Sequence, residues 1–151
     1  MIERLTPQTL HLCLEGGRLF FEEARHPGGF VPDVFLKTFG GMLDSGQGIV
    51  LASFDTQGDK KTITGALGGV LAPNPFNGWL MAIEMFWFML PAYRGRSDAL
   101  RLFSAFEDWA AEVNAKMISM IHLTQLQPKK LGALYERWGY SPIEVNYLKT
   151  L

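Results

Sequence analysis

The sequence has a single cysteine, no long hydrophobic run and no excess of charge of one sign, and each absence excludes something. One cysteine in 151 residues, Cys13, rules out an intramolecular disulfide and is typical of a reducing compartment. The longest apolar stretch, residues 79–90, carries Glu84 and is too short to span a bilayer. The first residues lack the apolar core of a signal peptide. We therefore expect a soluble, cytoplasmic protein without a membrane partner.

The charge balance and the histidines exclude two further classes of protein. The chain has 14 basic and 15 acidic residues, and a binder driven by phosphate neutralisation needs a clear basic excess. A nucleic-acid partner is therefore not expected, although a local basic patch would remain compatible with one. His11, His26 and His122 show no metal-ligand spacing, and one cysteine adds nothing to them. We predict no metal site.

The length and apolar content are those of one small domain. A chain of 151 residues with 48% hydrophobic and 13% aromatic residues can bury a substantial core. We see no internal repeat, low-complexity tract or charge block that would mark a linker. The whole chain, residues 1–151, is therefore predicted to form a single domain, large enough for a small cleft enzyme.

The N-terminal third reads as helical after a short first strand. Thr6-Pro7 is typical of a helix start, and Gly16-Gly17 is expected to stop or kink that helix. His26-Pro27-Gly28-Gly29 is a clear breaker. A second helix is predicted over residues 32–43, and its expected inward side chains are Val34, Phe35 and Phe39. Cys13 lies in an apolar run, so we expect it to be a small buried hydrophobe.

The remainder of the chain alternates between strands and helices. Apart from Glu84, residues 80–90 are apolar on both alternating faces, which predicts a central strand covered on both sides. Apolar residues at three- to four-residue spacing predict a helix after Pro91, and a shorter helix is expected to end near Gly139. The other predicted strands cover residues 49–54, 62–71, 117–123 and 144–151. This order predicts an α/β domain around one mixed sheet.

The segment after the central strand carries the most chemical information. Leu90-Pro91-Ala92-Tyr93-Arg94-Gly95 ends a buried strand, and a helix begins a few residues later. The first turn of a helix has unpaired N–H groups and a positive dipole end, so it can hold a phosphate. Arg94 and Arg96 would add positive charge beside it. A strand-turn-helix unit alone is not specific, because many α/β proteins have one.

This segment resembles the pyrophosphate signature of the GNAT superfamily of N-acetyltransferases, usually written Q/R-x-x-G-x-G/A. Arg94, Ala99 and the spacing between them match, whereas Ser97 replaces the middle glycine. Leu134-Tyr135-Glu136-Arg137-Trp138-Gly139-Tyr140 resembles the family's L-Y-x-x-x-G-F segment. The tryptophan-rich strand is also loosely similar to small phage-encoded members. The resemblance implies a GNAT fold, with a mixed, mostly antiparallel sheet of six to seven strands and about four helices.

The same resemblance implies acetyl-CoA as co-substrate and assigns residues to it. The pantetheine would pair with the strand backbone near residues 88–90, and backbone N–H groups of residues 96–99 would face the pyrophosphate. Ser97 in the loop can still offer its backbone N–H. The residues expected to bind acetyl-CoA are Phe88, Met89, Leu90, Arg94, Gly95, Arg96, Ser97, Asp98 and Ala99.

Two side chains are candidates for proton transfer. An alkylamine with a pKa of ~10.4 must lose a proton to attack, and a thiolate with a pKa of ~8.5 leaves better once protonated. Tyr135 occupies the position at which many family members place the acid for the sulfur; without the motif it would read as a core tyrosine. Glu84 is the only charge in residues 79–90, and we take it as the candidate general base, acting through a water. The alternative is that Glu84 points into a solvated cleft and only binds the acceptor.

The leading functional expectation is acetyl transfer from acetyl-CoA to an amine of a small molecule or protein, by direct attack in a ternary complex. Two alternatives stay open: modification of a nucleobase amino group, and a GNAT-fold module that binds acyl-CoA with little catalysis. The loops that would choose the acceptor, residues 25–33 and 71–78, carry no signature. Exposed aromatic residues there could line an acceptor site or form a homodimer surface.

Overall fold

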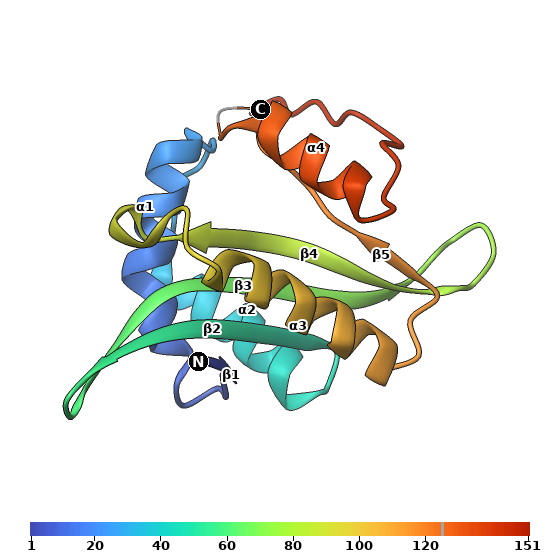
Figure 1. The fold of residues 1–151 in the computed structure, drawn as a ribbon. Helices are drawn as coiled ribbons and strands as arrows, with labels where there is room; N and C mark the ends of the chain where they lie inside the picture. Colours follow the sequence, from blue (N-terminus) through green and yellow to red (C-terminus); the bar gives the residue numbers. More distant parts are fainter. Residues whose placement is uncertain (125) are drawn as a thin grey trace.

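The computed structural model describes residues 1–124 and 126–151 as three layers built around one mixed sheet (Figure 1). The strands lie in the order β1-β2-β3-β4-β5, and every neighbouring pair is antiparallel except β4 and β5. The strands are β1 (Ile2–Arg4), β2 (Gly48–Gln57), β3 (Lys60–Pro73), β4 (Leu80–Met89) and β5 (Met117–Ser119). The helices are α1 (Leu14–Ala24), α2 (Pro32–Asp44), α3 (Asp98–Glu112) and α4 (Pro128–Arg137), with short 3₁₀ turns at Leu10–Cys13 and Pro91–Tyr93. The predicted α/β class with a mixed, mostly antiparallel sheet is confirmed.

Each face of the sheet has its own core. Alternate residues of β2 point to opposite faces, so Val50 and Ala52 pack towards the first turns and α2, whereas Ile49 and Leu51 pack towards α3. The three- to four-residue apolar spacing of α3 places its buried stripe on the second core. The buried residues of that stripe are Leu102, Phe103, Phe106, Trp109 and Ala110.

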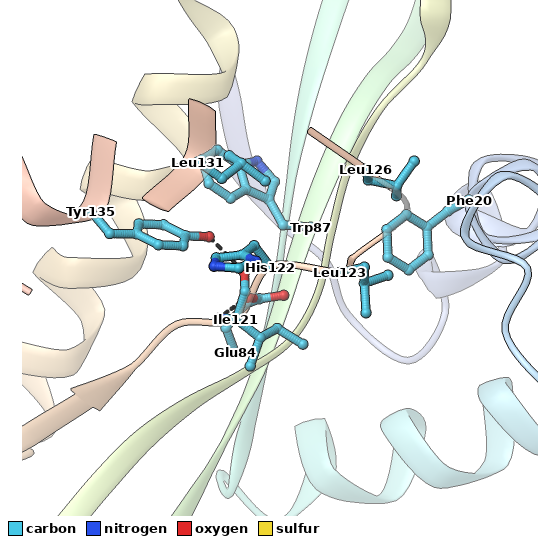
Figure 2. A pocket seen from close by; sticks show the side chains of 9 residues that line it. All are labelled: Phe20, Glu84, Trp87, Ile121, His122, Leu123, Leu126, Leu131 and Tyr135. Atoms are coloured by element: carbon cyan, nitrogen blue, oxygen red, sulfur yellow. Dashed lines mark hydrogen bonds between the residues drawn. The ribbon is translucent and has the colours of Figure 1, made fainter. Parts of the chain in front are cut away.

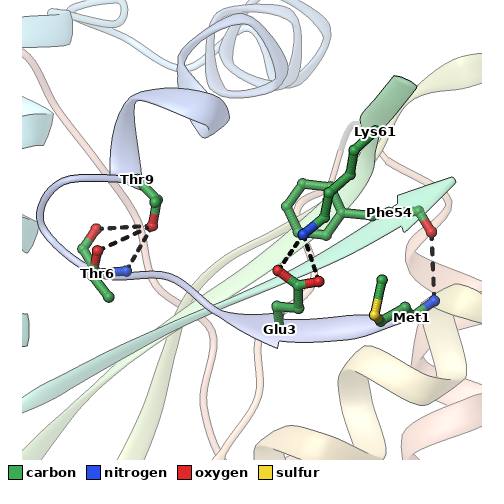
Figure 3. Close-up of polar contacts among 6 residues, drawn as sticks. All are labelled: Met1, Glu3, Thr6, Thr9, Phe54 and Lys61. Atoms are coloured by element: carbon green, nitrogen blue, oxygen red, sulfur yellow. Dashed lines mark hydrogen bonds and ion pairs between the residues drawn. The ribbon is translucent and has the colours of Figure 1, made fainter. Parts of the chain in front are cut away.

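The N-terminal strand is tied to the edge of the sheet by backbone and side-chain contacts (Figure 3). The N–H of Phe54 donates to the carbonyl of Met1 at 3.0 Å. The ammonium of Lys61 lies 4.2 Å from the ring centroid of Phe54 and pairs with the carboxylate of Glu3. These contacts hold β1 as one edge strand of the sheet, and β5 is the edge strand on the opposite side.

The glycines expected to stop the first helix lie inside α1 instead. A Cβ on Gly16 would stand 2.1 Å from the ring of Phe88, and one on Gly17 would stand 2.9 Å from the ring of Phe30. A glycine inside a helix costs roughly 1 kcal/mol relative to alanine. The close approach of α1 to β4 offsets that cost, and local propensity could not reveal it.

The sheet has fewer strands than predicted within the described residues. The segment 144–151, predicted as a final strand, has no strand pairing, and its apolar side chains Val145, Tyr147 and Leu148 are exposed. The strand predicted over 117–123 is limited to Met117–Ser119. An alternating pattern makes a strand only where another backbone edge is available, and β5 presents an edge of three residues. The prediction of six to seven strands is therefore wrong, because the described residues form five.

Val34, expected to point inward, is exposed on α2, whereas Phe39 is buried as predicted. Cys13 is fully buried, and burial raises the pKa of its thiol to about 12. None of the helices in the described part of the chain is long and apolar enough to cross a membrane.

Candidate active site

A β-bulge in the central strand brings an acidic and an aromatic side chain to the same face. In the pairing of β3 with β4, Gly69 lies opposite Glu84 but Gly68 lies opposite Phe86, so Met85 is an extra residue. Because side chains alternate along a strand, one extra residue reverses the faces that follow it. Glu84 therefore points to the same side as Trp87, whereas Phe86 and Phe88 point to the α1 and α2 side.

The carboxyl group of Glu84 is buried where β5 leaves β4. Backbone pairing between the two strands stops at Ile83 and Ser119. Beyond that point the N–H of Ile121 donates to Oε2 of Glu84 at 2.9 Å, so a side chain takes the place of the next ladder bond. Only 3% of Glu84 is exposed. Loss of solvation raises the pKa of this carboxyl to about 8, although the Ile121 N–H opposes the rise.

The hydroxyl of Tyr135 binds the backbone of the same residue, Ile121, through its carbonyl. Tyr135 lies on α4, and its Oη donates to the carbonyl of Ile121 at 2.8 Å. Burial, the charge of Glu84 and the neighbouring Tyr140 all hold the pKa of Tyr135 well above its ordinary value. The backbone of one residue, Ile121, thus links the carboxyl of Glu84 to the hydroxyl of Tyr135.

An aromatic cluster on α3 and α4 fixes the position of Tyr135. The ring of Phe103 on α3 lies 5.9 Å from that of Tyr135 and 4.5 Å from that of Trp138. Trp87 of β4 stacks on Phe103 at 5.7 Å with an interplanar angle of 10°. Tyr140 anchors the end of α4 by donating to Oε1 of Glu107 at 2.9 Å. The cluster ties α4 to the sheet through rigid side chains.

Glu84 and Tyr135 line one pocket with about 300 Å³ of empty space, part of it continuous with solvent. Figure 2 shows the hydroxyl of Tyr135 and the carboxyl of Glu84 converging on the chain at Ile121, with Phe20 and Leu126 at the opposite end. The indole N–H of Trp87 is buried and has no hydrogen-bond partner among the described residues. The lining residues are Phe20, Glu84, Trp87, Ile121, His122, Leu123, Leu126, Leu131 and Tyr135.

This arrangement can accept one proton and donate another within a small, mostly apolar space. A carboxyl with a pKa near 8 exists in both protonation states around neutral pH, as a general base requires. The tyrosine hydroxyl and the indole N–H are donors in the same pocket. The low polarity of the remaining lining strengthens any charge interaction made inside it.

The outer edge of β4 offers backbone groups to a ligand beside this pocket. The N–H of Leu90 donates to Thr64 of β3 at 2.8 Å, so by alternation the peptide groups of Trp87 and Met89 face away from β3. The carbonyl of Met89 accepts from Nε of Arg94 at 3.1 Å. Of the three residues predicted to pair with pantetheine, only Met89 therefore turns its backbone groups towards the open edge; those of Phe88 and Leu90 face β3.

The predicted pyrophosphate loop connects the end of β4 to α3. Gly95 has a φ of +80°, which favours glycine, and Ser97 is the N-cap residue of α3, whose first-turn N–H groups have no partner within the helix. The guanidinium of Arg94 pairs with Oε2 of Glu23 on α1 at 2.6 Å, and that of Arg96 lies 4.7 Å from the ring centroid of Tyr93. Asp98 adds an acidic side chain to the first turn, near Arg101. The loop thus has free N–H groups, but one of its arginines is engaged.

The structure also adds residues that the sequence had not singled out. The pocket is also lined by Ile121, Trp87 and Phe20, and no local sequence motif predicts these three residues. Only the unusual run of aromatics around Trp87 gave a signal. His122 lines the pocket as well, and Gly132 of α4 leaves space beside its ring. Within residues 1–124 and 126–151, no group of three or more potential ligands could hold a metal ion.

Comparison with known proteins relates this geometry to solved structures. No family model and no curated protein matches the sequence. A predicted acetyltransferase from Clostridium acetobutylicum, solved with acetyl-CoA, matches with a TM-score of 0.73 and 13% identity, covering 100% of this chain and 95% of that one. The ribosomal-protein-alanine N-acetyltransferase of Brucella melitensis matches with a TM-score of 0.69 and 17% identity over 100% and 99% of the two chains.

A third match comes from a complex with a bisubstrate analogue. AAC(6')-Iy, bound to CoA-S-monomethyl-acetylneamine, gives a TM-score of 0.69 at 17% identity, with 100% of this chain and 98% of that chain covered. All three similarities extend over the full length of the chain. The chain has the fold of these acetyltransferases, the GNAT fold.

Proposed function

We propose that this chain is an acyl-CoA-dependent N-acetyltransferase that moves the acetyl group of acetyl-CoA to an amine by direct attack in a ternary complex. The observation that carries the proposal is the buried Glu84, whose carboxyl lies in a pocket with Tyr135 at the point where β5 leaves β4. The fold shared with acetyltransferases solved with acetyl-CoA or a CoA analogue supports the choice of donor.

In this proposal Glu84 takes the proton that the amine must lose. The amine nitrogen attacks the thioester carbon, the C–N bond forms, and the C–S bond breaks. An alkylammonium has a pKa of about 10.4, so its deprotonation at neutral pH needs a base. The carboxyl of Glu84, with a pKa near 8, is better matched to this task than an ordinary carboxyl near 4.5. The proton passes to Glu84 directly or through one water.

Tyr135 supplies a proton to the departing sulfur. The negative charge of Glu84 is one cause of the raised pKa of Tyr135, so neutralising Glu84 lowers that pKa. Uptake of the amine's proton therefore makes Tyr135 a better donor at the stage when thiolate character develops. To act, its hydroxyl must exchange the carbonyl of Ile121 for the sulfur as its acceptor.

For acetyl-CoA we propose the outer edge of β4 and the loop that leads to α3. The outward peptide groups of Trp87 and Met89 are suited to the pantetheine amides, and the first-turn N–H groups of α3 are suited to the pyrophosphate. Arg94 joins the pyrophosphate once it separates from Glu23, with which it now pairs. Of the residues predicted from the sequence, seven are proposed to bind acetyl-CoA at this edge and loop: Met89, Arg94, Gly95, Arg96, Ser97, Asp98 and Ala99. Trp87 takes the place of Phe88 and Leu90, whose backbone groups face β3.

Calorimetric titration with acetyl-CoA, with ATP and free CoA as controls, tests the donor, and a thiol-release assay with an amine panel tests transfer. We expect micromolar binding of acetyl-CoA and amine-dependent release of CoA. Binding without release on any amine would leave a module that holds acyl-CoA. Absence of binding would overturn the proposal at its first step.

A further inference from the structure

The opposite side of β4 holds a second and larger pocket, with about 490 Å³ of empty space that is partly open to solvent. It lies between α1, α2 and the strand. Seven of the eleven phenylalanines line it, together with Cys13, Gly17 and Met85. None of these ten side chains carries a charge, so the pocket suits an apolar group and offers no charged side chain to a polar one.

Six of the phenylalanine rings form a closed circuit around this pocket. Each ring lies beside the next, with centroid separations between 5.5 and 6.4 Å, within the range of favourable aromatic pairs. In order around the circuit they are Phe20, Phe21, Phe30, Phe35, Phe86 and Phe88. A planar aromatic group could stack on the faces of these rings and meet their edges, which are the arrangements that aromatic pairs prefer.

The aromatic pocket adjoins the pocket of Glu84. Phe20 lines both, and Met85 of the aromatic pocket is the bulge residue that follows Glu84. Phe20 is therefore common to an apolar pocket and a pocket with a carboxyl group. A molecule that satisfies both sides has an apolar, planar end and a basic nitrogen. An acyl chain would satisfy only the apolar side.

We propose that the aromatic pocket binds the aryl group of the acceptor, and that the acceptor is an arylalkylamine whose nitrogen reaches Glu84 past Phe20. This inference rests on the proposed function and names its substrate class. Burying a ring of this size raises kcat/KM for 2-phenylethylamine roughly ten- to a hundredfold over ethanolamine, a primary amine without the apolar group.

Gly17→Ala tests the pocket with a matched control. The added Cβ would stand 2.9 Å from the far end of the Phe30 ring, so the ring must move and the pocket narrows. Gly41→Ala makes the same change inside α2, where a Cβ meets nothing within 4 Å. We expect Gly17→Ala to lower the kcat/KM ratio of 2-phenylethylamine to ethanolamine at least fivefold and Gly41→Ala to keep it. Phe30→Ala should enlarge the pocket and raise kcat/KM for the larger amine 2-(1-naphthyl)ethylamine.

Calorimetry with 2-phenylethylamine in the absence of acetyl-CoA tests the aryl site independently of acetyl transfer. If Gly17→Ala weakens this binding and Gly41→Ala does not, the aryl site is supported. If, in addition, no amine releases CoA, the proposed function fails and the aryl site stands. Efficient transfer to ethanolamine with no preference for the aryl amine leaves the function standing and overturns the inference. A preference for hexanoyl-CoA over acetyl-CoA that Gly17→Ala abolishes would assign the pocket to the acyl chain and also overturn it.

Discussion

At the scale of single residues, Glu84 couples activity and stability through one proton. Its pKa is raised from 4.5 to about 8 in the folded chain, so the folded state holds the proton more tightly than the unfolded state. The free energy of unfolding must therefore fall as pH rises from about 4.5 to about 8, and then level off. A shift of this size corresponds to a loss of up to about 5 kcal/mol.

Glu84→Gln removes this titration. We expect urea denaturation between pH 5 and 9 to show the stability of the variant relative to the parent chain increasing with pH. In the parent chain, kcat/KM should increase through pH 8 as the carboxyl ionises, whereas the variant should lose most of its activity at every pH. If the free energies of unfolding of the two chains change with pH in parallel, the pKa of Glu84 is not raised in the folded chain.

Tyr135 and Tyr140 form a matched pair of tyrosines in one aromatic cluster. Both rings contact Phe103, but only Tyr135 lines the pocket, whereas the hydroxyl of Tyr140 binds Glu107. We expect Tyr135→Phe to lower kcat roughly a hundredfold, as loss of a positioned acid does. Tyr140→Phe should lower the free energy of unfolding by about 1 kcal/mol, because it removes one hydrogen bond. It should lower kcat far less than Tyr135→Phe does. Full activity of Tyr135→Phe with an unchanged pH profile would remove the acid from the mechanism.

At the scale of elements, the contact between α1 and β4 holds Phe88 in the wall of the aromatic pocket. A Cβ on Gly16 would stand 2.1 Å from the Phe88 ring, so Gly16→Ala should destabilise the chain by roughly 1–3 kcal/mol. Gly41→Ala, with open space around its Cβ, should instead stabilise it by roughly 0.5–1 kcal/mol. Chemical denaturation of both variants measures the two signs. Equal effects would mean that α1 does not approach β4 this closely.

In the loop between β4 and α3, Glu23 and the proposed pyrophosphate would compete for the guanidinium of Arg94. Arg94 pairs with Glu23 of α1, and a pyrophosphate must compete with that carboxylate. We expect Glu23→Gln to tighten acetyl-CoA binding by roughly two- to fivefold, because a partly exposed pair contributes at most about 1 kcal/mol. Arg94→Ala should weaken binding by a larger factor. Calorimetry at two salt concentrations measures both effects, and unchanged affinity in both variants would place the pyrophosphate elsewhere.

At the scale of the whole molecule, a ligand that binds only the folded state raises its melting temperature. Acetyl-CoA at a hundredfold excess over its Kd adds about 2.7 kcal/mol of stability. For a chain of 151 residues this corresponds to an increase in Tm of roughly 5–10 °C. Differential scanning fluorimetry with acetyl-CoA and with ATP checks the prediction. An equal increase with both would indicate a general phosphate effect and not a site for acetyl-CoA.

Much of the architecture could be read from local patterns because local chemistry determines it. The apolar spacing of α3 and the two-sided apolar run of β4 both describe buried surfaces, and both elements lie where they were predicted. Gly16-Gly17 and the segment 144–151 were predicted wrongly for one reason. Whether a glycine pair ends a helix, or an alternating segment becomes a strand, depends on what packs beside it.

The sequence by itself determined the fold class and the order of the elements as far as the last helix, because burial patterns lie in consecutive residues. It also singled out Glu84 and Tyr135 as candidates, from a lone charge in an apolar run and from a motif. The tertiary structure alone decided that Met85 is a bulge that turns Glu84 and Trp87 to one face. It also decided that Ile121 joins Glu84 to Tyr135, and that six phenylalanine rings from α1, α2, β4 and the loop between the helices close around one pocket. Such relations join segments distant in the chain, and only packing brings them together.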